Sequence, residues 1–142
     1  FNDEGSSGLR PFVIGTLPEI NEVEPNDDWA KAQSLSESSL VVNGQHVKGG
    51  DSDSFAIPLK QGQTVVASLM ASRVIGSTQD ATLQVLSPTG FVLEQNEDDQ
   101  GFDPQLAFTA PADGTYYLRT WSLPMTPDSS IRLYGSPTAV YR

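Results

Sequence analysis

The sequence predicts an all-β domain, namely an antiparallel, jelly-roll-like β-sandwich of eight or nine short strands with one short N-terminal helix. After about residue 40, apolar and polar residues alternate with a period of two, which is the pattern of half-buried strands. Turn-forming residues recur roughly every 8–12 residues, the spacing typical of sandwiches and jelly rolls. Twelve glycines and ten prolines suit a fold of short strands joined by turns.

The strands are expected where this alternation or a β-branched run is clearest. We predict them over residues 40–42, 45–47, 55–59, 64–71, 81–85, 91–94, 106–110, 115–121 and 131–134, with 138–141 as a further candidate. Asn43-Gly44 is a strong signal for a type I′ turn and predicts a hairpin between the first two strands. In that hairpin His46 would be an exposed residue.

The N-terminal part of the chain has a different composition. Residues 1–18 are expected to be a tail or linker, or to contain the last strand of a preceding domain over Leu9–Thr16, and the sandwich domain is expected to span residues 19–142. Residues 28–33 favour about one helical turn, with Asp27 or Asp28 as N-cap. Trp29 would pack this small helix against the sandwich.

Composition excludes several classes of partner. The net charge is −10, with 18 acidic and 8 basic residues, so no basic stripe is present that could bind nucleic acid or an anionic membrane. No run of about 18 apolar residues predicts a membrane span. Cysteine is absent, which removes disulfides and thiolate metal sites. We expect a monomer, and we interpret the chain, which starts at Phe1 without a signal peptide, as a piece of a longer protein.

Two acidic motifs suggest a calcium site. In an extended segment alternate side chains share a face, so Glu22, Glu24 and Asn26 should point together, with Asp27 joining at the turn into the helix. Asp51 and Asp53 are also two apart. Calcium binds six to eight hard oxygens from carboxylates, amides and carbonyls. The alternative is a solvated acidic loop with a helix cap.

A second acidic group covers residues 96–103 (NEDDQGFD). Its aspartates could suit calcium, but it lacks the full EF-hand ligand series and the closing Glu. A hairpin loop rich in Asp and Asn is the other interpretation, so a metal at this loop stays open.

No catalytic constellation is present in the sequence. Gly50-Asp51-Ser52 is reminiscent of hydrolases with a GDS nucleophile, but the one histidine, His46, lies upstream of the serine. A serine without a base is inert, and no G-x-S-x-G elbow occurs. We therefore expect no enzymatic activity from this domain.

The motifs together resemble a known family. E-x-E-P-N-D at residues 22–27 precedes G-D-x-D-x-F at 50–55, L-x-V-L-x-P-x-G at 83–90 and A-P-A-D-G-T-Y-Y at 110–117. In this order they resemble the bacterial pre-peptidase C-terminal domain, which includes the collagen-binding domains of clostridial collagenases. The resemblance implies a jelly-roll sandwich attached to secreted hydrolases, without chemistry of its own. It also implies calcium held by Glu22, Glu24, Asn26, Asp27, Asp51 and Asp53.

One face of the predicted sandwich could bind a ligand. Alternation places Tyr116 and Leu118 in the core and Tyr117, Arg119 and Trp121 outward. If residues 130–134 pair beside that strand, the outward set comprises Tyr117, Arg119, Trp121, Arg132 and Tyr134. Aromatic and Arg side chains on a flat sheet are typical of binding surfaces. The alternative is that another domain or the N-terminal strand covers them.

The sequence therefore predicts a non-catalytic, calcium-binding accessory module of a secreted or cell-envelope bacterial protein, with neighbouring domains of the same polypeptide as its partners. It would act as a spacer, bind substrate or matrix, or aid folding after secretion. The alternative is a carbohydrate- or protein-binding module that uses the outward aromatic face to bind an extracellular protein or polysaccharide.

Overall fold

The computed structural model describes residues 11–37, 39–126, 129 and 132–142, and over them the fold is all-β and sandwich-like. The N-terminal elements are β1 (Glu19–Asn21), the single 3-10 turn η1 (Trp29–Lys31), β2 (Gln33–Ser34) and β3 (Val41–Gln45). The central ones are β4 (Ser52–Leu59), β5 (Thr64–Ser68), β6 (Gln79–Leu86) and β7 (Val92–Asn96). The last are β8 (Gln105–Thr109), β9 (Gly114–Pro124) and β10 (Val140–Tyr141). No helix among the described residues is long and apolar enough to cross a membrane.

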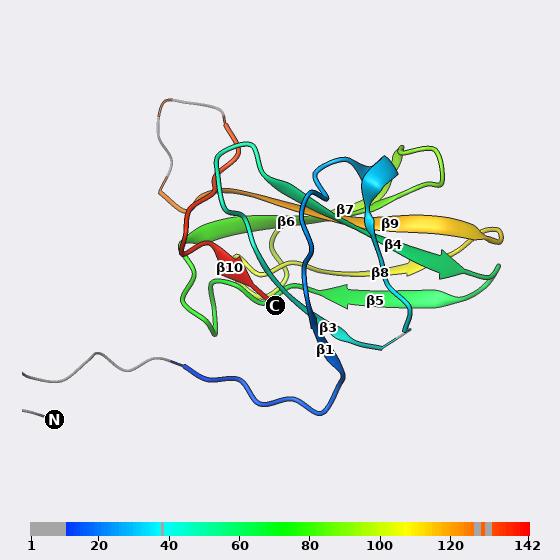
Figure 1. Ribbon diagram of the computed structural model, residues 1–142, viewed down its shortest axis with the longest axis horizontal. Helices are drawn as coiled ribbons and strands as arrows, with labels where there is room; N and C mark the ends of the chain where they lie inside the picture. The colour runs from blue at the N-terminus through cyan, green and yellow to red at the C-terminus, as the bar shows by residue number, and fades with distance from the viewer. Residues whose placement is uncertain (1–10, 38, 127–128, 130–131) are drawn as a thin grey trace, which may run out of the picture.

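The main sheet has five strands in the order β2-β4-β9-β6-β7 (Figure 1). Its three central strands, β4, β9 and β6, are antiparallel and eight to eleven residues long. The remaining strands form a three-stranded group, β1-β3-β10, and a pair, β5-β8. Two backbone hydrogen bonds between Met70 and Arg142 join these groups, because Met70 lies just after β5 and Arg142 just after β10.

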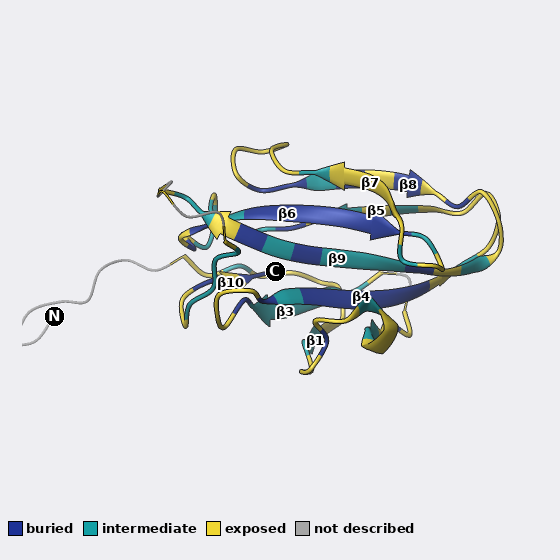
Figure 2. Ribbon diagram, turned by 90° about the horizontal axis from the view of Figure 1, so that it is seen from above, coloured by how far each residue is buried: buried dark blue, intermediate teal, exposed yellow. Residues whose placement is uncertain are grey.

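The core lies between the main sheet and these smaller groups. It contains inward side chains of β4, β6 and β9, such as Phe55, Val85 and Tyr116, and those of β5, β8 and β10 on the other side. The ring of Phe108 on β8 packs 5.1 Å from that of Tyr116 on β9, across the two layers. Figure 2 shows that burial is concentrated on β4, β6 and β9.

The structure corrects the predicted hairpin at Asn43-Gly44. Both residues lie inside β3, where Asn43 pairs with Asn21 and Gly44 with Tyr141. A Cβ at Gly44 would collide with the ring of Tyr141, so this glycine permits a close approach and does not form a turn. His46, expected to be exposed, is fully buried behind β3.

Other elements also differ from expectation. Residues 11–16 form no strand, and Leu9 and Arg10 lie outside the described residues. Residues 132–134 are not a strand either, and Ile131 lies outside the described part. Two pairs, β1 with β3 and β2 with β4, are parallel, so the sandwich is not wholly antiparallel. The helical turn is present, and Asp28 caps it by accepting a hydrogen bond from the Ala30 amide at 3.0 Å.

Candidate metal centre and the outward face of the main sheet

The segment between β1 and η1 is tied to the start of β4 by hydrogen bonds. The Ser54 amide donates to the carbonyl of Asn26 at 3.1 Å. The Ser52 hydroxyl donates to the carbonyl of Asp27 at 3.2 Å, and the Ser52 amide to Asp27 Oδ1 at 3.4 Å. These contacts hold the E-x-E-P-N-D motif against the G-D-x-D-x-F motif, although 25 residues separate Asp27 from Ser52.

Three carboxylates converge where the motifs meet. Glu24, Asp51 and Asp53 each offer an oxygen, and these atoms lie within 4.8 Å of one another. Asp51 and Asp53 are fully buried, whereas Glu24 is exposed. Because the two aspartates are separated by one residue in extended backbone, they reach the same side. Asp51 Oδ1 has no hydrogen-bond partner among the described residues, so this buried acceptor lacks a donor.

Asn26 is buried beside two of these carboxylates, those of Asp53 and Glu24. Its side chain is fully buried, and its amide lies beside Asp53 Oδ1 and Glu24 Oε2. With the nitrogen turned inward, it donates to these oxygens at 3.1 and 3.0 Å. With the oxygen turned inward, it faces only acceptors, an orientation that a cation between these oxygens would stabilise. The same amide can therefore satisfy the carboxylates or join them as a ligand.

Glu22 and Asp27 lie next to the cluster, Glu22 beside Asp53 and Asp27 beside Asp51. Glu22 accepts from the Gln45 amide at 2.8 Å and from the Tyr141 hydroxyl at 2.8 Å, and that hydroxyl also contacts Asp53 Oδ2 at 2.6 Å. Glu22 is thus connected to Asp53 through Tyr141 and lies outside the group of three converging oxygens. Asp27 is exposed at the rim, 3.9 Å from the ammonium of Lys48.

Sequence reasoning missed Tyr141 and the true position of His46. His46 Nε2 lies 3.6 Å from Asp53 Oδ2, and Nδ1 contacts the Gln79 side chain at 2.7 Å. Burial lowers the pKa of His46, so its neutral form is favoured. Neither Tyr141 nor His46 lies in an acidic motif, so the sequence carries no local signal that would place them at this site.

The electrostatics of the cluster disfavour its full ionisation. Burial raises the pKa of Asp53 to about 8, and the charges of Glu22 and Asp51 act in the same direction, opposed by the Tyr141 hydroxyl. Burial also raises the pKa of Asp51, with contributions from Glu24 and Asp27. Burial raises the pKa of Tyr141, and the carboxylates of Asp53 and Glu22 act in the same direction. Two buried aspartates beside further carboxylates are a costly arrangement that a divalent ion would relieve.

In the acidic loop at 96–103, Asp103 stabilises the backbone of residues 71–73. Asp103 is buried, and its carboxylate accepts from the backbone amides of Ala71, Ser72 and Arg73 at 3.1, 2.7 and 3.1 Å. The loop carries the chain from β7 in the main sheet to β8 in the other layer, so it is not a hairpin turn. Among the described residues, Glu24, Asp51 and Asp53 are the one group of three metal-ligating side chains with this spacing.

The outward face of β9 has the predicted alternation. Tyr116 is 3% exposed and Leu118 packs against the core, whereas Tyr117, Arg119 and Trp121 are half-buried on the other side. Within the chain, the Trp29 ring packs edge-on at 5.2 Å from that of Tyr117, and Arg119 donates to Gln84 at 3.0 and 2.6 Å. Part of this face is therefore covered by the domain itself, and Trp29 packs η1 against it.

Arg132 and Tyr134 do not extend this face as a paired strand. Tyr134 makes one ladder-like contact, from its amide to the Ser122 carbonyl at 2.7 Å. Its hydroxyl lies near Thr78 at 3.1 Å, at the start of β6, whereas Tyr117 pairs with Leu86 at the opposite end of that strand. Arg132 is exposed. Ligand binding by the five predicted residues stays a prediction.

Replacing Trp121 with Ala is expected to cost about 1 kcal/mol of unfolding free energy, because Trp121 is half-buried on the outward face. Tyr116→Ala, the control in the core of the same strand, should cost about 3–5 kcal/mol. Urea denaturation of both variants measures the difference. Equal losses would mean that the outward face is packed like the core and is not available to a ligand.

Comparison with known proteins supports the fold and the motifs. Residues 51–120 match the family model of the bacterial pre-peptidase C-terminal domain. A probable subtilase-type serine protease of Deinococcus radiodurans is 33% identical over 107 residues, which are 75% of this chain but 15% of that protein. The crystal structure of the pre-peptidase C-terminal domain of a Bacillus anthracis collagenase covers 89% of this chain and 95% of its own, with a TM-score of 0.52 at 13% identity, a likeness of fold. The chain belongs to the bacterial pre-peptidase C-terminal domain family, whose domains are themselves non-catalytic.

Proposed function

We propose that the chain is a calcium-binding accessory module of a secreted or cell-envelope multidomain bacterial protein. The observation that carries the proposal is the convergence of Glu24, Asp51 and Asp53 on one point, with Asp51 Oδ1 buried and lacking a donor among the described residues. The sequence similarity to part of a longer bacterial protein, a probable subtilase-type serine protease, supports the multidomain bacterial setting.

The donor set fits calcium better than a softer metal. Glu24, Asp51, Asp53 and Asn26 offer only carboxylate and amide oxygens, which are the ligands that calcium prefers. Asp27 at the rim can add one more carboxylate. His46 is beside Asp53, but its ring is held by Gln79 and does not belong to the group of converging ligand atoms. Without imidazole or thiolate ligands, a zinc site is disfavoured.

Calcium at this place would join two parts of the chain. Glu24 and Asn26 precede η1, whereas Asp51 comes directly before β4 and Asp53 lies at its start. An ion bound by both pairs would neutralise the buried carboxylates and fix the N-terminal segment on the main sheet. The module would then present its N-terminal connection in one orientation to a preceding domain, which is what a spacer between domains requires.

The length of the Deinococcus relative supports a role for this chain as one domain among others. The chain spans 15% of the Deinococcus protein that it matches, so an accessory position beside other domains is consistent with the comparison. We propose neighbouring domains of the same polypeptide as the immediate partners. Aid to folding after secretion, spacing of domains and attachment to an extracellular protein or polysaccharide are the activities such a module can perform.

Calcium is expected to raise the melting temperature, because an ion that binds only the folded state stabilises it by mass action. At a concentration one hundred times the Kd, the gain is about 2.7 kcal/mol, or roughly 8–10 °C for a domain of this size. Differential scanning calorimetry of the chain in EDTA and in millimolar calcium measures it. Magnesium is the control and should have a smaller effect, since it resists dehydration. Identical melting temperatures in EDTA and calcium would refute the site.

A further inference from the structure

The layer opposite the main sheet has an opening between β3 and β5. β3 pairs with β1 along one edge and, over Gly44 and Gln45, with β10 along the other. β5 pairs with β8 along one edge, and beyond its end Met70 exchanges two backbone hydrogen bonds with Arg142, at 2.7 and 2.8 Å. Since β10 has two residues, the part of the chain that the structure describes places no strand between most of the facing edges of β3 and β5 (Figure 1).

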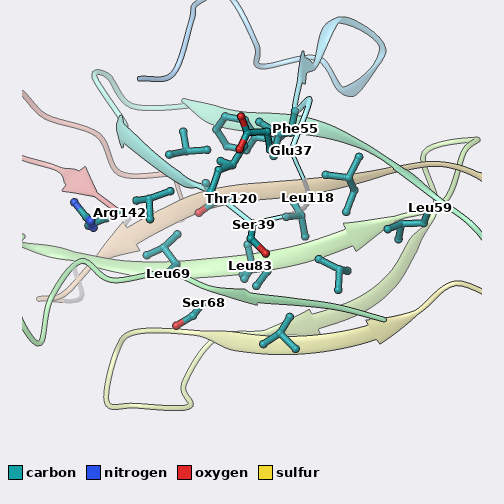
Figure 3. Close-up of a pocket in the computed structure, with 18 of the residues that line it drawn as sticks. Glu37, Ser39, Phe55, Leu59, Ser68, Leu69, Leu83, Leu118, Thr120 and Arg142 are labelled. Carbon is teal, nitrogen blue, oxygen red and sulfur yellow. The ribbon is translucent and has the colours of Figure 1, made fainter. Parts of the chain in front are cut away.

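A cavity of about 770 Å³ fills this opening. Val42 of β3 and Ala67 of β5 line its sides, and Phe55, Leu83 and Leu118 of the main sheet are among the residues lining it from behind. Figure 3 shows these three side chains in the gap between the two layers, with Arg142 at one end. The opening therefore borders core-facing apolar side chains of the main sheet: Phe55 and Leu83 are buried and Leu118 is half-buried, and a strand in the opening would complete their cover.

Along β5, the edge that faces the opening has no partner strand among the described residues. Along a strand, the amide and carbonyl of alternate residues point to alternate edges. Leu69 donates toward β8, to the carbonyl of Pro104, whereas Met70 bonds Arg142 on the other side. Val66 and Ser68 are in phase with Met70, so their amides and carbonyls face the opening.

The edge of β3 does the same from the opposite side. Val41 donates to the carbonyl of Pro18, and Asn43 accepts from the amide of Glu22, so both residues are directed toward β1. Val42 lies between them and directs its backbone groups to the opening. Two strand edges thus face each other across a gap lined by apolar side chains.

The end of β10 is already in register with both edges. Tyr141 pairs with Gly44 of β3, and the next residue, Arg142, bonds Met70 on the β5 side. Consecutive residues bond to opposite neighbours, as they do in a central strand. A strand continuing from the Arg142 carbonyl would enter the opening without a turn. Its first and third residues would bond β3 and point inward as Tyr141 does, and its second and fourth would bond β5 and point outward.

We propose that this opening binds one extended strand that continues β10. The strand is provided by polypeptide joined to Arg142 and has apolar side chains at its first and third positions. The strand would lie antiparallel to both β3 and β5 and would close the layer opposite the main sheet. The inference rests on the proposed role of the chain as a module within a longer polypeptide. It makes the stability of the module depend on the polypeptide that follows it.

The test adds Val-Thr-Val-Thr-Val directly after Arg142 and compares it with Val-Pro-Val-Pro-Val. Proline at the second and fourth positions removes the amides that would bond β5, while the apolar side chains stay the same. The first extension is expected to raise the melting temperature by about 5–10 °C. Hydrogen exchange at Val42, Val66 and Ser68 should slow at least tenfold. The proline extension should give less than half of the melting shift.

Three results would overturn the proposal. One is the same melting temperature for the chain with and without the first extension, and another is an equal gain from both extensions. The third is stabilisation that appears only in a dimer by light scattering, because the strand would then be exchanged between copies. All measurements are repeated in EDTA and in calcium. If the extension raises the melting temperature but calcium does not, the metal site alone is refuted. If calcium raises the melting temperature but the extension does not, the proposed strand alone is refuted.

Discussion

Replacing Asp53 with Asn is expected to remove most of the stabilisation by calcium without destabilising the calcium-free protein. Asp53 is fully buried among Glu24, Asp51 and Glu22, so its negative charge is unfavourable unless a cation faces it. Asn has the same shape and still accepts from the Tyr141 hydroxyl. Loss of one carboxylate ligand should weaken calcium binding about 100-fold. At one hundred times the wild-type Kd, this removes about 2.3 of the roughly 2.7 kcal/mol of stabilisation. Calorimetry in EDTA and in calcium measures both halves of the prediction.

Asp103→Ala provides the matched control for this variant. Asp103 is a buried aspartate that accepts three backbone hydrogen bonds from residues 71–73 and lies outside the converging group. Its removal should cost about 2–3 kcal/mol in EDTA and in calcium alike, because hydrogen bonds to a charged acceptor are lost. If Asp103→Ala instead abolished the calcium effect and Asp53→Asn did not, the metal would belong to the 96–103 loop.

The pH dependence gives a second readout of Asp53. Its pKa lies at about 8 in the folded chain and at the ordinary 3.8 when exposed, so between these values the folded state binds the additional proton. Stability of the calcium-free wild type should therefore fall, relative to Asp53→Asn, as the pH rises from about 4 to about 8. Calcium binding must displace that proton, so the calcium stabilisation grows over the same window. A difference between the two proteins that does not change with pH would contradict this assignment.

The long strands could be predicted from sequence because their residues have a clear period of two. β4, β6 and β9 alternate in contact with the core, and the expected burial of Tyr116 beside the outward Tyr117 is confirmed. β1 and β2 could not be predicted, because each has two or three residues and pairs in parallel with a distant strand. Such short strands exist through tertiary pairing and have no periodicity of their own.

The candidate site was predictable in part for the same reason. Spacing by two places Asp51 and Asp53 on one side wherever the strand lies, and their convergence with Glu24 is seen in the structure. The connection of Glu22 to Asp53 through Tyr141 joins positions 119 residues apart, and no local pattern encodes it. His46 was misplaced because the turn expected at Asn43-Gly44 would have exposed it.

Gly44→Ala is expected to be the most damaging small substitution near the site, at a cost of about 3 kcal/mol. Gly44 lies inside β3, where the strand itself would tolerate alanine, but its Cβ would overlap the Tyr141 ring and hydroxyl and lie 2.6 Å from Glu22 Oε2. Tyr141 is 5% exposed, and hydrogen bonds from its hydroxyl to Glu22 and Asp53 oppose a shift of the ring. Overpacking in a closed core costs about 1–3 kcal/mol, and displacing the hydroxyl adds the loss of its bonds to Glu22 and Asp53. Urea denaturation measures the change.

A double-mutant cycle with Tyr141→Leu separates this steric cause from a general effect of replacing glycine. With the ring removed, Gly44→Ala should cost less than about 1 kcal/mol, giving a coupling of about 2 kcal/mol between neighbours in contact. Gly62→Ala is the control, because Gly62 has a positive φ of 81° and no atom within 4 Å of an added Cβ. Its cost of about 1 kcal/mol arises from backbone conformation and should be the same with Tyr141 or Leu at position 141. If the cost of Gly44→Ala is also unchanged by Tyr141→Leu, the Tyr141 ring is not the reason why position 44 requires glycine. The Asn-Gly pair would then need another explanation than the approach of β10 to β3.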